Sequence, residues 1–341
     1  MQYTHLIADI ELTNRCNALC SFCPRDKTPT QGMISREVFY KAVSRVAELE
    51  SPPRVSLTGQ GEPTLHPDLP HFIAHVKKQG LHAGMTTNAS LMKPELAEQV
   101  LGAGLDKISF SVSNFGEDYH MVYNLDFDNS LNNILHFLDI NNGRCEVGVN
   151  IVHHDLNKKK IGEMVNFWRE KGIEQFTHFR PSNRGGACEN GRLSIGNSDK
   201  LPEAEALMRE RGITSLCDAA FLFLFVGWTG HYYICCNDYQ KTTRLGHVSE
   251  LGFSDLNEIK LKSLACGSVQ ACVDCDLDPV NKVRESLLEV EHGLADEAAV
   301  EETLQGLTKG QKGLPNHHSD IDWKIRYLEG GENLIARSGL G

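Results

Sequence analysis

Residues 13–25 read Thr13-Asn14-Arg15-Cys16-Asn17-Ala18-Leu19-Cys20-Ser21-Phe22-Cys23-Pro24-Arg25 and directly follow an apolar run at residues 6–12. Three thiolates on one short loop can hold three irons of a [4Fe–4S] cluster, which normally takes four cysteines. The fourth iron then keeps an open coordination position, and an open position separates a reactive metal site from a structural one. Zinc sites usually combine paired Cys-x2-Cys units, and no second pair lies near this loop. The spacing therefore favours a reactive iron–sulfur site.

Composition excludes several classes of protein. The chain has 341 residues, which predicts about two domains, and a net charge of −11. Because binding to phosphates needs a basic face, nucleic acid and anionic membrane are not expected as partners. No apolar stretch reaches the ~18 residues of a membrane span, and no basic-then-apolar leader is present, so we expect a cytoplasmic protein. In a reducing compartment, eleven cysteines indicate metal binding rather than disulfides.

The first half of the chain alternates strand and helix patterns. Strands are predicted at residues 6–12, 54–58, 81–87, 107–112, 145–152 and 175–180. Helices are predicted at residues 36–50, 68–79, 94–104, 127–140 and 161–171. Such alternation with short links predicts a parallel sheet with right-handed crossovers. We expect a partial (β/α)6 barrel of the α/β class, with function at the carboxyl ends of its strands, where the cysteine loop lies.

Three domains are predicted from changes in composition along the chain. Residues 1–196 form the barrel, and residues 197–280 form a small module built on a β-hairpin that contains most of the remaining cysteines. Residues 281–341 form a helical extension, with a helix at 283–307, a loop at 308–320 and packing across the lower mouth of the barrel. The pair His317-His318 in that loop is expected to be exposed to solvent.

The motif Cys16-x3-Cys20-x2-Cys23 resembles the signature of the radical S-adenosylmethionine (AdoMet) enzyme superfamily. The resemblance covers roughly residues 6–195. In that family AdoMet chelates the open iron, and one electron from the cluster cleaves its carbon–sulfur bond. The resulting 5′-deoxyadenosyl radical abstracts a hydrogen atom from the substrate, while the protein binds, orients and excludes water. The resemblance also implies an electron donor of the flavodoxin or ferredoxin type.

A second segment, Gly59-Gln60-Gly61-Glu62-Pro63, resembles the glycine–glycine–glutamate–proline segment with which the family receives the AdoMet ammonium group. Gln60 interrupts the glycine pair, so the backbone group that would touch the amine is left open. By the same resemblance, the residues expected to line the AdoMet pocket are Gly61, Glu62, Asn88, Ser111, Ser113 and Asn150.

The second group of cysteines comprises Cys217, Cys235, Cys236, Cys266, Cys272 and Cys275. Four thiolates on a hairpin and a later Cys-x2-Cys turn suit either a [4Fe–4S] cluster or structural zinc. The spacing resembles the shortened auxiliary-cluster module of radical AdoMet enzymes, the twitch form of the SPASM domain. That resemblance implies one auxiliary [4Fe–4S] cluster on Cys217, Cys235, Cys272 and Cys275. Cys236 and Cys266 are left over, and either could replace one of these ligands.

The same resemblance implies a reaction on a small polar molecule, such as the dehydrogenation of an aminocyclitol in an antibiotic pathway, of which 2-deoxy-scyllo-inosamine dehydrogenase is the type. The base or orienting group would come from the candidates Arg180, Arg184, His153 and His154. The alternative is a radical epimerase, in which Cys236 or Cys188 returns a hydrogen atom. A radical decarboxylase, a peptide maturase and a non-catalytic zinc–iron protein are further alternatives, and the oligomeric state is not predicted.

Overall fold

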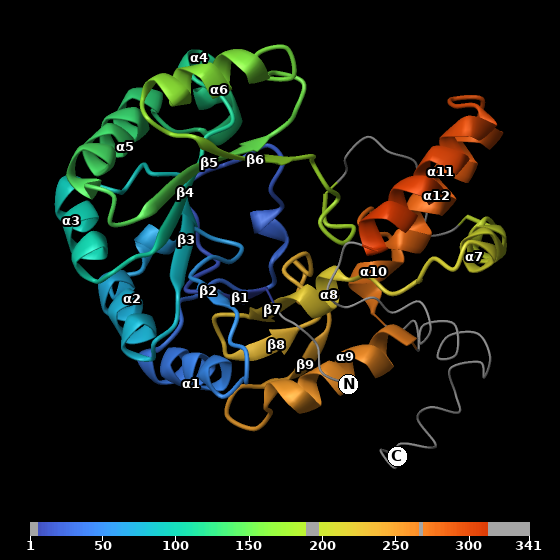
Figure 1. Cartoon of the computed structure of the whole chain (residues 1–341), viewed down its shortest axis with the longest axis horizontal. Coiled ribbons are helices and arrows are strands. Elements are labelled where there is room, and N and C mark those ends of the chain that lie inside the picture. Colours follow the sequence, from blue (N-terminus) through green and yellow to red (C-terminus); the bar gives the residue numbers. More distant parts are fainter. Residues whose placement is uncertain (1–5, 189–197, 266–268, 313–341) are drawn as a thin grey trace.

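The computed structural model describes residues 6–188, 198–265 and 269–312, and its centre is one curved nine-stranded sheet (Figure 1). The strand order is β6-β5-β4-β3-β2-β1-β7-β8-β9. The strands are β1 (Ile7–Ile10), β2 (Arg54–Ser56), β3 (Ala83–Thr87), β4 (Lys107–Ser111), β5 (Glu146–Val152), β6 (Gln175–Phe179), β7 (Phe223–Val226), β8 (His231–Tyr233) and β9 (Arg244–His247). Strands β1 to β7 pair in parallel, whereas β8 and β9 run antiparallel.

Helices cover the outer side of the curved sheet, and the inner side is left for a site (Figure 1). The helices of the barrel are α1 (Arg36–Ala47), α2 (Leu69–Lys78), α3 (Pro94–Gly102), α4 (Gly116–Tyr123), α5 (Phe127–Asn141) and α6 (Ile161–Glu170). On β1, Ala8 and Ile10 are buried in the core, and Asp9 between them faces the other side of the sheet. The predicted partial β/α barrel is therefore confirmed.

Local sequence signals account for most of these helices. The Ser35 hydroxyl accepts a hydrogen bond from Val38 N at the start of α1, and Asp126 caps α5 through Asn129 N. Helix α4 was not predicted, because the prediction placed no element between the fourth strand and α5. It begins directly after β4 and supports the cysteine loop, as described below.

The predicted hairpin does not form a sheet of its own. Strand β7 pairs in parallel with β1, from Ile7 opposite Phe223 to Ile10 opposite Val226, and β8 and β9 continue the same sheet. The cysteines that follow β8 are thus held at the edge of the barrel by backbone hydrogen bonds. The domain boundaries at 196 and 280 stay predictions, although the sheet continues across the first of them.

The C-terminal helices build a second, smaller core beside the sheet. Helix α7 (Leu201–Glu210) packs with α11 (Pro279–Glu291) and α12 (Glu297–Lys312), and Met208, Val283 and Leu304 are buried between them. The shorter helix α8 (Ala219–Leu222) precedes β7, α9 (Phe253–Ala265) follows β9, and α10 (Gln270–Val273) lies before α11.

Three expectations for this C-terminal part are wrong. The single helix predicted at 283–307 is divided at Gly293, whose φ of +68° ends α11, and α12 continues through residues 308–312, which were predicted as loop. The helices pack on α7 rather than across the lower mouth of the barrel (Figure 1). His317 and His318 lie outside the described residues. None of the helices in the described ranges is long and apolar enough to cross a membrane.

Candidate active site

The loop that carries Cys16, Cys20 and Cys23, here named the cysteine triad, leaves the carboxyl end of β1. Leu19 N donates to Tyr123 O at 2.8 Å, and Ser21 N donates to Val122 O at 3.1 Å. Both acceptors lie in the last turn of α4, so the unpredicted helix holds the middle of the loop. The three thiols are free and partly exposed, which leaves them accessible to an incoming cluster.

The ionised, thiolate form of the triad is electrostatically unfavourable without a metal. Burial raises the pKa of Cys16 to about 11 and also raises that of Cys20. Cys23 disfavours the ionisation of both thiols further, and Cys16 disfavours that of Cys20. A coordinating thiol is deprotonated by the positive charge of the metal that it binds. The donor set therefore fits a group that supplies cationic charge to three thiolates at once.

The arrangement of the cysteines also bears on which metal group fits. In the described part of the chain, no three His, Cys, Asp or Glu side chains are arranged to hold a single metal ion. In a [4Fe–4S] cluster each cysteine binds its own iron, so the sulfur atoms stay apart. The triad is thus compatible with a cubane cluster, with Cys16, Cys20 and Cys23 as its predicted ligands.

The glycine segment after β2 packs directly on the cysteine loop. A Cβ atom at Gly61 would lie 2.4 Å from Arg15 O and 2.5 Å from Thr13 O, so no other residue fits there without moving the loop. Glu62 N donates to Arg15 O at 2.9 Å. The glycine at position 61 therefore has a packing role that couples this segment to the triad.

The carboxylate of Glu62 joins the ends of β2 and β3. Its Oε1 atom accepts from Thr87 Oγ1 at 2.7 Å, and its Oε2 atom accepts from Asn88 N at 2.9 Å. Asn88 Nδ2 in turn donates to Asn17 Oδ1 at 3.1 Å, inside the cysteine loop. Burial raises the pKa of Glu62, and these hydrogen bonds oppose that shift. The structure thus gives Glu62 a positioning role, and its contact with AdoMet stays a prediction.

Replacing Glu62 by glutamine tests this network. The amide nitrogen of Glu62→Gln would face a backbone or hydroxyl donor, which leaves a buried polar group unsatisfied at a cost of about 1–3 kcal/mol. We expect the free energy of unfolding to fall by about that amount in urea denaturation, and AdoMet to bind at least about tenfold more weakly. The matched control is Glu98→Gln on the exposed side of α3, which should change neither quantity. Equal stability of the two variants would contradict the network.

The other residues predicted to contact AdoMet differ in how far their side chains are buried. Ser111 and Asn150 are opposite each other on β4 and β5, partly exposed, and Asn150 Nδ2 lies 3.5 Å from Thr86 Oγ1. Ser113 is fully buried, and its hydroxyl accepts from Val152 N at 2.9 Å and from Tyr123 Oη at 2.8 Å. Ser113 Oγ thus has two donors within the core, and its contact with AdoMet stays a prediction.

Four cysteines of the second group interact with one another. Cys235 and Cys272 both interact electrostatically with Cys217 and Cys275. Burial is the main cause that raises the pKa of Cys217 to about 12 and of Cys275 to about 11. As in the triad, buried thiols that disfavour one another's ionisation fit a cationic cluster. Cys266 lies outside the described residues.

The turn that carries Cys272 and Cys275 is fixed from two sides. The side-chain amide of Asn281 in α11 donates to Cys272 O at 2.9 Å and to Cys275 O at 3.0 Å. From the loop after β6, Asn183 Oδ1 accepts from Asp276 N at 3.2 Å, and Asn183 N donates to Asp276 Oδ2 at 2.9 Å. The four-cysteine set is thus positioned by the barrel, the hairpin and α11 together.

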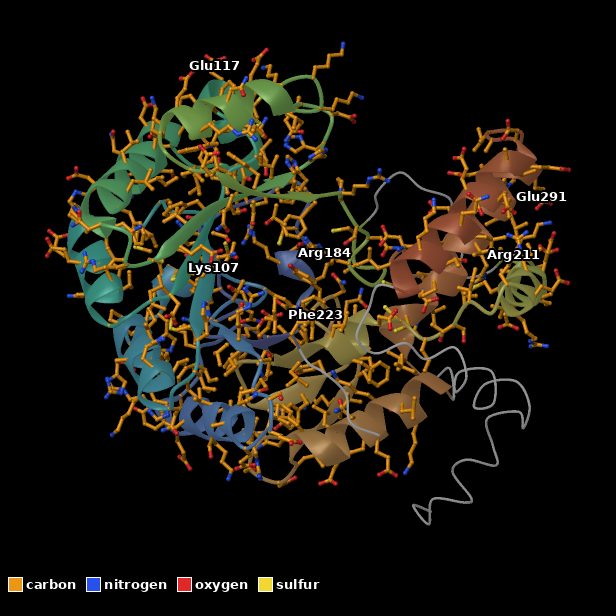
Figure 2. All side chains as sticks on the ribbon, in the orientation of Figure 1. Lys107, Glu117, Arg184, Arg211, Phe223 and Glu291 are labelled. Carbon is orange, nitrogen blue, oxygen red and sulfur yellow. The ribbon has the colours of Figure 1, made fainter. Side chains whose placement is uncertain are left out.

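Cys236 has different neighbours from Cys235. The charged side chains that most affect the ionisation of the Cys236 thiol are Asp9, Arg184 and Lys241, whereas the ionisation of Cys235 is affected by Cys236, Cys217 and Cys275. Asp9 belongs to β1, and Figure 2 shows Arg184 between the barrel and the hairpin. This placement supports Cys235 as the auxiliary ligand and puts Cys236 at the inner side of the sheet.

Cys188 and Arg184 also lie near the triad. The Cys188 thiol is 3.9 Å from Phe22 O and interacts electrostatically with Cys23. The Arg184 guanidinium interacts with the same two cysteines and lies 5.7 Å from the ring centroid of Tyr239. Both candidates from the sequence are therefore at the site.

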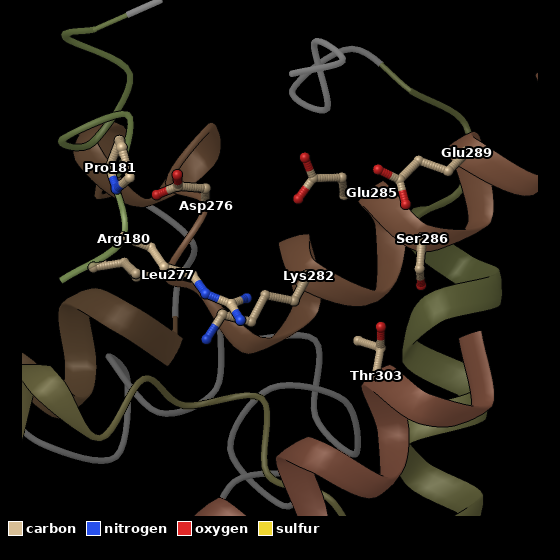
Figure 3. A pocket seen from close by; sticks show the side chains of 9 residues that line it. All are labelled: Arg180, Pro181, Asp276, Leu277, Lys282, Glu285, Ser286, Glu289 and Thr303. Carbon is tan, nitrogen blue, oxygen red and sulfur yellow. The ribbon is translucent and has the colours of Figure 1, made fainter. Parts of the chain in front are cut away.

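Arg180 and His153 are not brought to this group. Arg180 is exposed and lines a separate pocket of about 300 Å³ together with Lys282 and Glu285 of α11 (Figure 3). His153 lies at the sheet edge, where its Nε2 is 2.9 Å from His178 Nδ1. Of the histidine candidates, His154 lies closer to the triad loop, with its ring 5.9 Å from that of Phe22.

Several residues that connect the hairpin to the barrel were not predicted from the sequence. Lys241 Nζ lies 3.3 Å from Glu11 Oε2 in a buried ion pair. Tyr239 Oη lies 3.9 Å from Cys23 Sγ, and burial raises the pKa of Asp9 to about 7. The acids at positions 9 and 11 were a usable signal, because they alternate within an otherwise apolar strand and so share its inner face.

Comparison with known sequences identifies a family. The model of the Radical SAM superfamily matches residues 10–167. A probable GTP 3′,8-cyclase of Thermoplasma volcanium is 32% identical over 52% of this chain and 54% of its own length. A tungsten-containing aldehyde ferredoxin oxidoreductase cofactor-modifying protein of Pyrococcus furiosus is 23% identical over 51% of this chain and 50% of its own length. The chain thus spans about half the length of these curated relatives.

Solved structures share the fold. BtrN in complex with AdoMet and 2-DOIA superposes with a TM-score of 0.52 at 16% identity, over 81% of this chain and 94% of BtrN. SuiB of Streptococcus suis, bound to the precursor peptide SuiA, gives 0.61 at 16% identity over 81% and 71%. The protein anSMEcpe with bound AdoMet gives 0.60 at 13% identity over 90% and 98%. The resemblance extends beyond the barrel to most of the chain.

Proposed function

Because the chain belongs to the radical SAM superfamily, we propose that it dehydrogenates an alcohol of a small polar molecule, of the sugar or aminocyclitol type. Two [4Fe–4S] clusters are proposed, one on the triad and one on Cys217, Cys235, Cys272 and Cys275. The observation that carries the proposal is the second set of interacting thiols, which the parallel pairing of β7 with β1 fixes beside the barrel. An auxiliary cluster there could accept an electron from the substrate.

The proposed reaction oxidises an alcohol group of the substrate to a carbonyl group. Cys16, Cys20 and Cys23 would hold a cluster that, given one electron from a flavodoxin- or ferredoxin-type donor, would supply the cleavage of AdoMet to methionine and a 5′-deoxyadenosyl radical. Transfer of a hydrogen atom from the carbinol C–H gives 5′-deoxyadenosine. Loss of the hydroxyl proton and of one further electron, to the oxidised auxiliary cluster, leaves the carbonyl product. The net change in the substrate is the loss of two hydrogen atoms.

The residues of this chain would bind the substrate, position it and receive the proton. Asp9 would accept the proton, because burial raises its pKa to about 7 and it interacts with Cys236. Arg184 keeps its proton at this pH and so would orient a substrate oxygen instead. Tyr239 and Phe22 lie beside the triad and would keep water away from it.

One observation favours radical epimerisation as the second candidate. Besides its neighbour Cys235, the Cys236 thiol interacts with Asp9 and Arg184, so it could return a hydrogen atom to a substrate radical. Burial raises the pKa of Cys236 to about 11, which keeps the S–H bond that such a donor needs. Peptide maturation and decarboxylation are weaker alternatives. The peptide in the SuiB structure is a property of that protein, and no residue pair described here favours either reaction.

Reaction in deuterium oxide separates the two candidates. The reconstituted enzyme, AdoMet, dithionite and 2-deoxy-scyllo-inosamine would be combined without oxygen, and the product analysed by mass spectrometry. We expect a product about two mass units lighter than the substrate, because two hydrogen atoms are lost. An epimerase would instead give a product of unchanged redox state with one solvent-derived deuterium on carbon. Cys236→Ala or Cys188→Ala would stall an epimerase and spare dehydrogenation.

A further inference from the structure

Two buried polar atoms at this site have no hydrogen-bond partner in the described part of the chain. They are Gln60 Oε1, on a side chain only 3% exposed, and Arg184 Nε. Nearly all buried polar groups in proteins are hydrogen-bonded, so an unpartnered one needs an explanation. One of these atoms is an acceptor and the other is a donor, which together are the complement of a hydroxyl group.

The two side chains are held at neighbouring residues of the segment after β8. Gln60 Nε2 donates to Cys236 O at 3.2 Å, and Arg184 Nη1 donates to Asn237 Oδ1 at 3.3 Å. Gln60 is thus anchored through Nε2 and Arg184 through Nη1, whereas Gln60 Oε1 and Arg184 Nε have no partner in the described part of the chain. Arg184 is labelled in Figure 2 and lies between the barrel and the hairpin.

The backbone of Gln60 is fixed as well. Its N–H group donates to Glu11 Oε1 at 3.0 Å, and Glu11 is held in turn by Lys241. A Cβ atom at Gly59 would lie 2.4 Å from Glu11 Cγ, so the segment packs directly against Glu11 and leaves no room for a side chain at position 59. Because these contacts leave Gln60 little freedom, its free oxygen presents a preformed acceptor rather than a side chain that could turn to solvent.

We propose that Gln60 and Arg184 form a hydroxyl-binding subsite for the substrate. A single hydroxyl group would donate to Gln60 Oε1 and accept from Arg184 Nε–H, beside the Cys236 thiol. The ligand class is a polyhydroxylated small molecule such as a cyclitol or sugar. This inference rests on the proposed function and adds Gln60, the residue that departs from the family's glycine pair, as a determinant of substrate specificity.

The test measures binding to the oxygen-free, AdoMet-loaded enzyme by isothermal titration calorimetry. The probes are 2-deoxy-scyllo-inosamine and myo-inositol, with cyclohexylamine as the ring that has an amine and no hydroxyl groups. We expect the wild type to bind both hydroxylated probes and not cyclohexylamine. Gln60→Met removes the acceptor, and Arg184→Lys keeps the charge but removes Nε–H. Each should weaken probe binding by about tenfold, the loss for one hydrogen bond.

A double-mutant cycle shows whether both residues bind the same hydroxyl group. If they do, the double variant should lose about 10- to 20-fold in affinity, since the second substitution removes a bond already broken, whereas independent sites would multiply to about 100-fold. The matched control is Gln79→Met at the exposed end of α2, which should bind the probes like the wild type.

Three results would overturn the subsite. The first is that the wild type binds neither hydroxylated probe, and the second is that Gln60→Met binds the probes as the wild type does. The third is that AdoMet no longer changes the electron paramagnetic resonance spectrum of the reduced cluster in the Gln60→Met variant. The last result would assign the free oxygen to AdoMet. Failure of the proposed function is distinguishable, because it would appear in the wild type as an enzyme without iron or without AdoMet cleavage.

Discussion

Replacement of Cys20 by alanine is expected to reduce AdoMet cleavage below detection and to lower the iron content from about eight to about four per chain. Cys20 is a predicted triad ligand whose pKa is raised by burial and by the neighbouring thiols, so its thiolate form depends on the positive charge of a bound metal. Two thiolates cannot hold the cluster and leave one iron open for AdoMet. Iron and 5′-deoxyadenosine would be measured after anaerobic reconstitution. Cys16→Ala and Cys23→Ala should behave in the same way.

The matched control is Cys145→Ala, since Cys145 is free, buried near the start of β5 and far along the sheet from the triad. This variant should keep about eight irons and cleave AdoMet. Cleavage of AdoMet by the Cys20→Ala variant at the wild-type rate would contradict the assignment of the triad. Loss of iron in both variants would point to a general effect of cysteine removal on folding.

The second large effect concerns the adjacent cysteines 235 and 236. Cys235→Ala should lower the iron content from about eight to about four per chain and abolish formation of the oxidised product. Cys236→Ala should keep about eight irons, because the thiol of Cys235, and not that of Cys236, interacts with both Cys217 and Cys275 among the largest causes of its pKa shift. The two variants share the same chemistry and almost the same position, so each controls for the other.

The outcomes can be told apart by spectroscopy as well as by iron analysis. In Cys235→Ala, the remaining cluster should still change its electron paramagnetic resonance when AdoMet is added, since the triad is intact. Iron loss in Cys236→Ala with full iron in Cys235→Ala would reverse the assignment. Zinc at the second site of the wild type would remove the auxiliary electron acceptor and with it the proposed dehydrogenation.

The barrel could be predicted because each of its first five strands is followed by an amphipathic helix, and that alternation has few solutions. The parallel pairing of β7 with β1 could not, because an apolar run of four residues reads the same whichever strand it joins. Helix α4 was missed for a related reason. It has only 8 residues and begins with Gly116, so its sequence is too short to show a clear helical repeat.

The candidate site shows a similar division. The spacing of the triad and the Cys272-x2-Cys275 turn are visible in the sequence. The choice between Cys235 and Cys236 is not, since neighbouring residues point to opposite sides and only the tertiary contacts tell which side is which. The free atoms of Gln60 and Arg184 depend on contacts with residues 236 and 237, which are far away in the sequence. Arg180 and Arg184 look equivalent until the loop after β6 separates them.

We propose that a cluster on Cys16, Cys20 and Cys23 has one iron that binds AdoMet, and the proposed reaction depends on this iron. Electron paramagnetic resonance of the oxygen-free, dithionite-reduced protein, recorded before and after addition of AdoMet, tests this directly. We predict a changed signal for the triad cluster in the wild type and in the Cys235→Ala variant. An identical spectrum with and without AdoMet, in protein that contains about four or more irons per chain, would contradict it.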